Sequence, residues 1–229
     1  YAWKEAGVLV EQLRILENSH GKWQVLFQGR SRGSKCISVR EMAKLISGVS
    51  GRGFAPVKDS KALLGEESQS LVFCENCRLT AGYGVARAVR EDEQVSGDNF
   101  SFQMLDNGCC VMAVSDGMGS GYAACKESEM VIDLIEKFME AGFLPDTALR
   151  MMNSAMVTHG ENNLFSTVDL MRLDLDSGAA EFYKIGASAT FIRHGKEVRM
   201  VTQKSMPVGV FAGQQVPKVS EQLADGDFV

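Results

Sequence analysis

Asp98 and Asp116 are the two acidic residues whose spacing is best suited to chemistry. Asp98 precedes one run of alternating apolar residues, Asp116 ends a second run, and the turn sequence Asp106-Asn107-Gly108 joins the two runs. A three-residue loop would place Asp98 opposite Asp116, whereas a tighter turn would place Asp98 opposite Gly117. In either register, two carboxylates lie side by side at the open end of one hairpin, on its apolar face.

This placement needs compensation, because opposed like charges destabilise a sheet and carboxylates at the margin of a core lose hydration. Either one carboxyl group keeps its proton, or a cation lies between the two. Oxygen ligands favour Mg²⁺ or Mn²⁺ over Zn²⁺. Gly117, Gly119 and Gly121 leave room for a backbone carbonyl ligand and for a phosphate. The alternative is that both aspartates only cap the hairpin and the helix that follows.

The segments around both aspartates resemble a known family. Ser96-Gly97-Asp98-Asn99-Phe100-Ser101 and Ser115-Asp116-Gly117-Met118-Gly119-Ser120-Gly121 are similar to the catalytic core of the stage II sporulation protein E family, the sporulation branch of the metal-dependent (type 2C) serine/threonine phosphatases. Later segments that fit the same domain are 166–170, 184–188 and 206–209. The resemblance covers about residues 96–229, and residues 1–95 are more weakly similar to the regulatory segment that precedes that domain.

The resemblance implies a β-sandwich flanked by helices that holds two metal ions, manganese or magnesium. By it, Asp116 bridges both ions, the Gly117 carbonyl binds one of them, and Asp98 ligates one directly or through water. The implied reaction is metal-assisted hydrolysis, in which activated water attacks the phosphorus of a phosphoserine. The implied partner is a phosphorylated anti-anti-sigma factor, whose dephosphorylation activates a sporulation sigma factor.

The chain departs from the family pattern at its C-terminal end. The family carries further aspartates downstream of a strand that would begin at Val229, and Asp225 and Asp227 precede that strand, so they are not substitutes. We therefore expect a phosphatase domain truncated at its C-terminus, with an incomplete metal site. The alternative to an active phosphatase is a non-catalytic regulatory or dimerisation fragment of one.

The elements around the hairpin indicate an α+β fold, because antiparallel strand patterns enclose two helices. One helix is predicted over 121–141, with Val131 and Ile135 on its apolar face and Gly142 as its stop. A second helix follows Pro145. Further strands are predicted over 166–175, 179–185, 189–193 and 197–202.

Three regions are expected along the chain. Residues 1–19 carry Leu9, Leu13 and Leu16 at a spacing that predicts an amphipathic helix, which either packs on its own domain or pairs with a second copy to form a homodimer. Residues 20–94 form a small α/β regulatory unit. Residues 95–229 form the type 2C phosphatase-like domain.

The 20–94 unit is predicted to contain strands near 23–27, 71–73 and 83–89, and a helix that starts with a capping box at Ser38. In the last strand Arg87 falls on the same face as Tyr83, Val85 and Val89, so the alternation is imperfect there. The acidic run Glu91-Asp92-Glu93 is expected to be a loop.

Two other motifs suggest different chemistry. Residues 119–124 match a G-x-G-x-x-A dinucleotide fingerprint, but the preceding strand returns from a tight hairpin instead of belonging to a βαβ unit. Cys74 and Cys77 form half of a zinc site, without a second pair at the right spacing. We expect neither a dinucleotide nor zinc.

Composition limits the class of protein. The chain has 229 residues and a net charge of -5, which argues against nucleic-acid binding. Six cysteines in a chain of this length indicate a reducing compartment and not a disulfide scaffold. No apolar run is long enough to span a bilayer. We expect a cytoplasmic domain of a longer, membrane-anchored protein.

Overall fold

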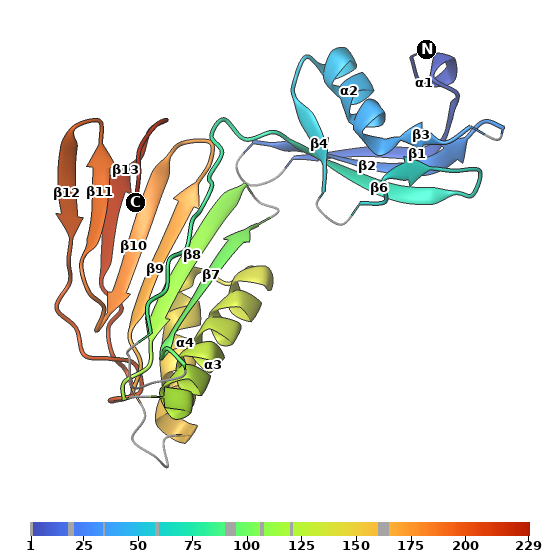
Figure 1. Ribbon diagram of the computed structural model, residues 1–229. Coiled ribbons are helices and arrows are strands. Elements are labelled where there is room, and N and C mark those ends of the chain that lie inside the picture. Colours follow the sequence, from blue (N-terminus) through green and yellow to red (C-terminus); the bar gives the residue numbers. More distant parts are fainter. Residues whose placement is uncertain are drawn as a thin grey trace. The chain divides into compact units, whose positions relative to one another are not determined.

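The computed structural model describes residues 2–17, 21–33, 35–57, 60–89, 95–105, 108–119, 121–159 and 165–229. The chain divides into two compact units, one ending at Cys77 and one beginning at Arg78 (Figure 1). Each unit has its own buried hydrophobic cluster. The predicted turn residues Asp106 and Asn107, and the predicted loop 91–93, lie outside the described residues.

The first unit is an antiparallel sheet with the strand order β1-β2-β6-β4. Helix α2 (Val39–Ser50) contributes Met42 and Ile46 to the buried cluster that contains Phe27 and Phe73 of the sheet. The other elements of the first unit are α1 Ala2–Glu5, β1 Val8–Glu17, β2 Trp23–Ser31, β3 Ile37–Ser38, β4 Phe54–Pro56, β5 Leu63–Leu64 and β6 Gln69–Glu75. Ser38 is the N-cap of α2, as predicted, but the predicted capping box is not formed, because the Ser38 side chain makes no capping hydrogen bond.

The predicted helix over residues 1–19 is wrong. Among the described residues of this range, only Ala2–Glu5 is helical, and Gly7, with a φ of 77°, separates that turn from strand β1. Strand β1 pairs along its length with β2, with one irregularity between Val10 and Gln12, so a sheet neighbour satisfies its backbone groups. An apolar spacing this short fits a helix and an irregular strand equally well. The predicted dimer through an N-terminal helix therefore loses its structural basis.

The second unit is built on a five-stranded sheet with the order β13-β10-β9-β8-β7, antiparallel between all neighbours. Its strands are β7 Asp98–Met104, β8 Cys109–Asp116, β9 Val168–Asp174, β10 Ala179–Ile185 and β13 Lys218–Gln222. Helices α3 (Gly121–Glu140) and α4 (Pro145–His159) cover one face of this sheet (Figure 1). A separate hairpin consists of β11 (Thr190–His194) and β12 (Glu197–Val201).

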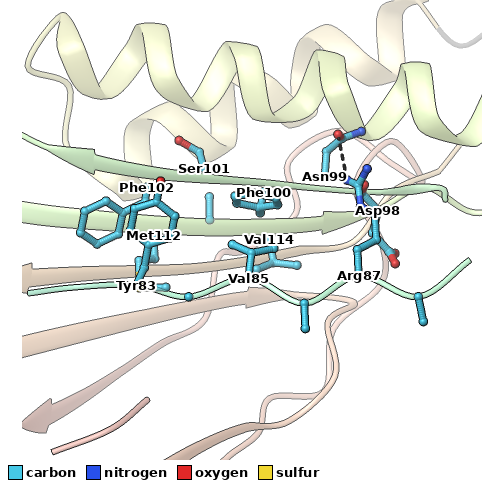
Figure 2. Close-up of a pocket in the computed structure, with 14 residues that line it drawn as sticks. Tyr83, Val85, Arg87, Asp98, Asn99, Phe100, Ser101, Phe102, Met112 and Val114 are labelled. Atoms are coloured by element: carbon cyan, nitrogen blue, oxygen red, sulfur yellow. Dashed lines mark hydrogen bonds between the residues drawn. The ribbon is translucent and has the colours of Figure 1, made fainter. Parts of the chain in front are cut away.

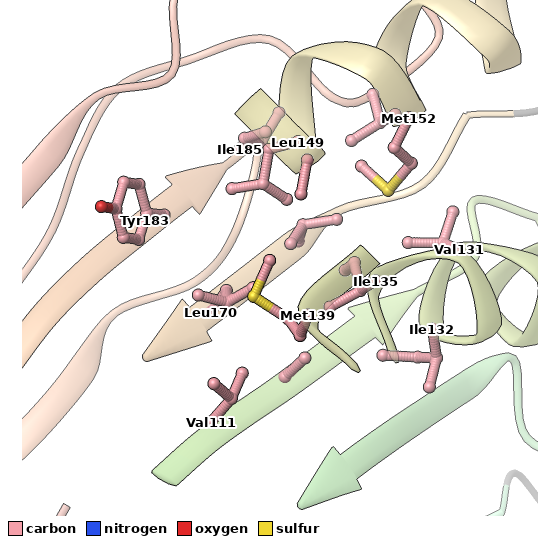
Figure 3. Close-up of a cluster of buried hydrophobic side chains, with 14 of the residues drawn as sticks. Val111, Val131, Ile132, Ile135, Met139, Leu149, Met152, Leu170, Tyr183 and Ile185 are labelled. Atoms are coloured by element: carbon pink, nitrogen blue, oxygen red, sulfur yellow. The ribbon is translucent and has the colours of Figure 1, made fainter. Parts of the chain in front are cut away.

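The core of the second unit lies between the two helices and the sheet. Figure 3 shows Val131 and Ile135 of α3 and Met152 of α4 packed over Leu170 of β9, and all four side chains are buried. Both helices were predicted, the first with Val131 and Ile135 on its apolar face, and Gly142 ends α3 with a φ of 81°. The α+β fold class is therefore confirmed.

Residues 79–89 are not the strand that was predicted. They form an extended segment that belongs to none of the described strands (Figure 1). The segment belongs to the second unit, because the Leu79 N–H donates to the Leu175 carbonyl (2.7 Å) and the Tyr83 ring stacks on Phe102, with centroids 4.4 Å apart. The division between the units accordingly falls after Cys77 and not after residue 94.

Candidate active site

The two predicted site carboxylates do lie side by side. Asp98 of β7 is the register partner of Asp116 of β8, which is the first of the two registers predicted from the sequence and excludes the pairing of Asp98 with Gly117. Both aspartates are exposed to solvent. Their carboxylates therefore do not lose hydration at the margin of a core, contrary to the expectation from the sequence. What remains is the proximity of two like charges, which an intervening cation would offset.

Each aspartate is held by neighbouring polar groups. The Ser96 hydroxyl donates to the carboxylate of Asp98 at 3.0 Å. The Asp116 N–H donates to the Thr167 hydroxyl at 3.1 Å, while the Asp116 carbonyl accepts from the Thr167 N–H at 2.9 Å and from the Ser166 hydroxyl at 3.0 Å. The segment before β9 therefore fixes the backbone at Asp116.

Gly117 is buried where helix α3 meets the end of strand β8. A Cβ atom at this position would lie 2.1 Å from the Ala124 carbonyl oxygen, so a larger residue does not fit. Gly97 faces the same alanine, since a Cβ there would lie 3.2 Å from the Ala124 Cβ, and the Gly117 N–H donates to the Gly97 carbonyl (3.1 Å). The two glycines let the first turns of α3 pack directly against the residues beside both carboxylates.

A polar network joins α3 to the strand that carries Asp98. The Asn99 amide donates to the Ser128 hydroxyl at 2.8 Å and to the Cys125 carbonyl at 3.0 Å. Ser128 in turn donates to the Gly97 carbonyl. Ser128 was not predicted as part of the site, because nothing in the local pattern of a helix reveals a partner 29 residues away in the sequence.

Glu127 is a second residue that the sequence analysis missed. It lies on the inner face of α3 with only 4% of its surface exposed, and its Oε2 atom has no hydrogen-bond partner in the described part of the structure. Burial raises the pKa of this carboxyl group above its ordinary value.

The oxygen ligands available at the end of the hairpin are two carboxylates and a backbone carbonyl. Ligands of this chemical type suit a hard cation. The described residues contain no group of three or more His, Cys, Asp or Glu side chains that could hold a metal ion. Asp227 is engaged elsewhere, because hydrogen bonds from the Ala224 N–H and from His194 lower the pKa of its carboxyl group.

The dinucleotide fingerprint at 119–124 lacks its structural context. Strand β8, which precedes it, is antiparallel to both β7 and β9. A parallel βαβ unit is therefore not formed at this strand. Ser120, which lies within the motif, is outside the described residues.

None of the described helices combines the length and the apolar character needed to cross a membrane.

Comparison with known proteins gives a consistent set of relatives. The family model for stage II sporulation protein E (SpoIIE) matches residues 106–229. The chain is 33% identical over 233 aligned residues to stage II sporulation protein E of Priestia megaterium, covering 100% of this chain and 39% of that protein. It is 36% identical over 146 residues to the Bacillus subtilis protein of the same name, covering 64% of this chain and 18% of that protein. The chain thus spans well under half the length of these curated relatives.

A solved structure that this chain matches contains the PP2C phosphatase domain and a fragment of the regulatory domain of SpoIIE from Bacillus subtilis. The TM-score is 0.67 and the sequence identity 27%, and the match covers 99% of this chain and 65% of that one. The expected type 2C phosphatase fold is therefore confirmed.

Proposed function

Because the chain belongs to the stage II sporulation protein E family, we propose that it is the part of a metal-dependent protein serine phosphatase that carries the paired aspartates. The observation that supports this most directly is the register pairing of Asp98 with Asp116 at the end of the β7–β8 hairpin. Two hydrolytic metal ions need such a cluster of oxygen donors.

The proposed ligands are the carboxylates of Asp98 and Asp116 and the carbonyl of Gly117. The proposed ions are Mn²⁺ or Mg²⁺, two of them in the complete domain. When bound, such ions would lower the pKa of water and offset charge on a phosphoryl group. The protein's own contribution is orientation. Thr167 and Ser166 fix the backbone at Asp116, and Ser96 restricts the carboxylate of Asp98.

The proposed substrate is a phosphoserine on a small anti-anti-sigma factor, whose dephosphorylation would activate a sporulation sigma factor. We further propose that the first compact unit, which ends at Cys77, is regulatory and that the phosphatase domain lies on the cytoplasmic side of a membrane-anchored protein. These proposals follow from the family alone.

Phosphate release from a phosphoserine-bearing anti-anti-sigma factor tests the proposed function. With Mn²⁺, the longer phosphatase that contains this chain should release phosphate, and Asp116→Asn should reduce the rate by at least about a hundredfold, because the residue would contact both ions. Asp133→Asn, on the exposed face of α3, is the matched control and should leave the rate unchanged. Equal rates in all three proteins would contradict the assignment.

A further inference from the structure

The extended segment 79–89 lies along the face of the β7–β8 hairpin that the helices leave open. A groove of about 300 Å³ runs between the segment and the two strands, and its apolar lining includes Val85, Phe100 and Val114 (Figure 2). Stacking of Tyr83 on Phe102 anchors one end of the segment. Figure 2 shows Tyr83 and Val85 beneath this apolar part of the groove.

Arg87 occupies the next position on the same face of the segment, where the alternation of apolar residues predicted from the sequence is broken. It lies at the end of the groove beside Asp98 (Figure 2). Its Nη2 atom donates to the Asp98 carbonyl and, at 3.3 Å, to the Asn99 side-chain oxygen. The segment therefore brings a permanent positive charge to the carboxylate end of the hairpin.

The way in which this guanidinium is held leaves it able to bind another group. Both contacts use a single nitrogen and neutral acceptors, and no ion pair joins Arg87 to a carboxylate among the described residues. The side chain is also exposed. A guanidinium fixed through one nitrogen keeps N–H groups on its other edge for a second ligand, and its planar fork matches two oxygens of a phosphoryl group.

We propose that Arg87 binds the phosphoryl group of the substrate at the proposed metal site, with its free edge directed to two of the phosphoryl oxygens. This inference rests on the proposed function and adds to it a residue that recognises the substrate. The charge is appropriate, because a phosphate dianion that approaches Asp98 and Asp116 needs cationic groups beyond the ions themselves. The anchored ring of Tyr83 would keep the segment, and with it Arg87, in register with the hairpin.

Calorimetric titration of inorganic phosphate into the chain, saturated with Mn²⁺, tests this inference. Arg87→Lys should weaken phosphate binding by at least about tenfold, because an ammonium group cannot present two parallel N–H donors. The same variant should retain its Mn²⁺ affinity. Arg150→Lys, an exposed arginine of α4 that pairs with Asp146, is the matched control and should retain both affinities.

Three outcomes would overturn the assignment of Arg87. If Arg87→Lys binds phosphate as well as Arg150→Lys does, the guanidinium is not a phosphate ligand, and the proposed function is unaffected. If Arg87→Lys loses Mn²⁺ affinity, the residue supports the backbone at Asp98 and does not recognise substrate. If the unsubstituted chain binds no Mn²⁺, the proposed function fails, and this inference fails with it.

Discussion

At the scale of single residues, Gly117 lies where helix α3 comes closest to the paired aspartates. Its neighbour on α3 is the Ala124 carbonyl, a backbone group that cannot rotate away as a flexible side chain could. A side chain at this position must therefore displace either the helix or the end of strand β8.

Gly117→Ala should lower the free energy of unfolding by about 2 kcal/mol and weaken Mn²⁺ binding, because the added Cβ overlaps the Ala124 carbonyl. Urea unfolding and metal titration measure the two effects. Gly84→Ala is the control, since a Cβ at Gly84 would meet open space, and its unfolding free energy should change by less than about 0.5 kcal/mol. A Gly117→Ala variant as stable as Gly84→Ala would show that the close packing is relaxed in solution.

The sequence could predict the pairing of Asp98 with Asp116, because a short turn and the period of two fix a hairpin register locally. It could not predict the surroundings of Lys184, which is fully buried on β10 and forms an ion pair with Asp169 and a hydrogen bond to Thr190. A buried lysine depends on partners from other strands, and a single strand's pattern does not contain them.

At the scale of elements, helices α3 and α4 could be predicted because their apolar faces repeat over several turns and Gly142 marks a stop. Strand β1 could not be predicted, because the spacing of its apolar residues over ten positions also fits a helix. Only its pairing with β2 makes the segment a strand. Strand β13 was missed for a related reason, because it is a short edge strand with a largely polar sequence.

Helix α3 carries its own destabilising group in Glu127. Burial raises the pKa of this carboxyl group in the folded chain above that in the unfolded chain. The folded state therefore has its full stability contribution from protonated Glu127 below about pH 4.3, the ordinary pKa of glutamate. It is lost as the pH rises through the folded-state pKa.

Glu127→Gln should therefore stabilise the protein at pH 7.5 by about 1 kcal/mol, because the variant does not bury a charge. At pH 4.5 the difference between the variant and the original chain should be smaller. Urea unfolding at the two pH values measures both differences. A stability difference that is the same at both pH values would show that ionisation of Glu127 is not responsible for the destabilisation.

At the scale of the whole molecule, the chain consists of two units with separate hydrophobic clusters. One cluster contains residues between Val8 and Phe73, and the other contains residues between Val111 and Val208. Separate cores allow the two units to unfold independently. The proposed metal site lies entirely within the second unit.

Phe73→Ala tests this independence, because Phe73 is fully buried in the first cluster. Loss of its ring should lower the unfolding free energy of the first unit by about 4 kcal/mol, while Mn²⁺ binding by the second unit stays unchanged. Differential scanning calorimetry should show one transition moving to lower temperature and a second remaining in place. A single transition that moves as a whole would show that the units unfold together.

The measurement that tests the central claim most directly is calorimetric titration of Mn²⁺ into the chain and into Asp116→Asn. We predict binding by the original chain and its loss in the variant, because Asp116 is the carboxylate proposed to bridge two ions. Asp225→Asn, in an exposed turn, should bind as the original chain does. Equal Mn²⁺ binding by Asp116→Asn and the original chain would contradict the account, since the paired aspartates would then not form the metal site.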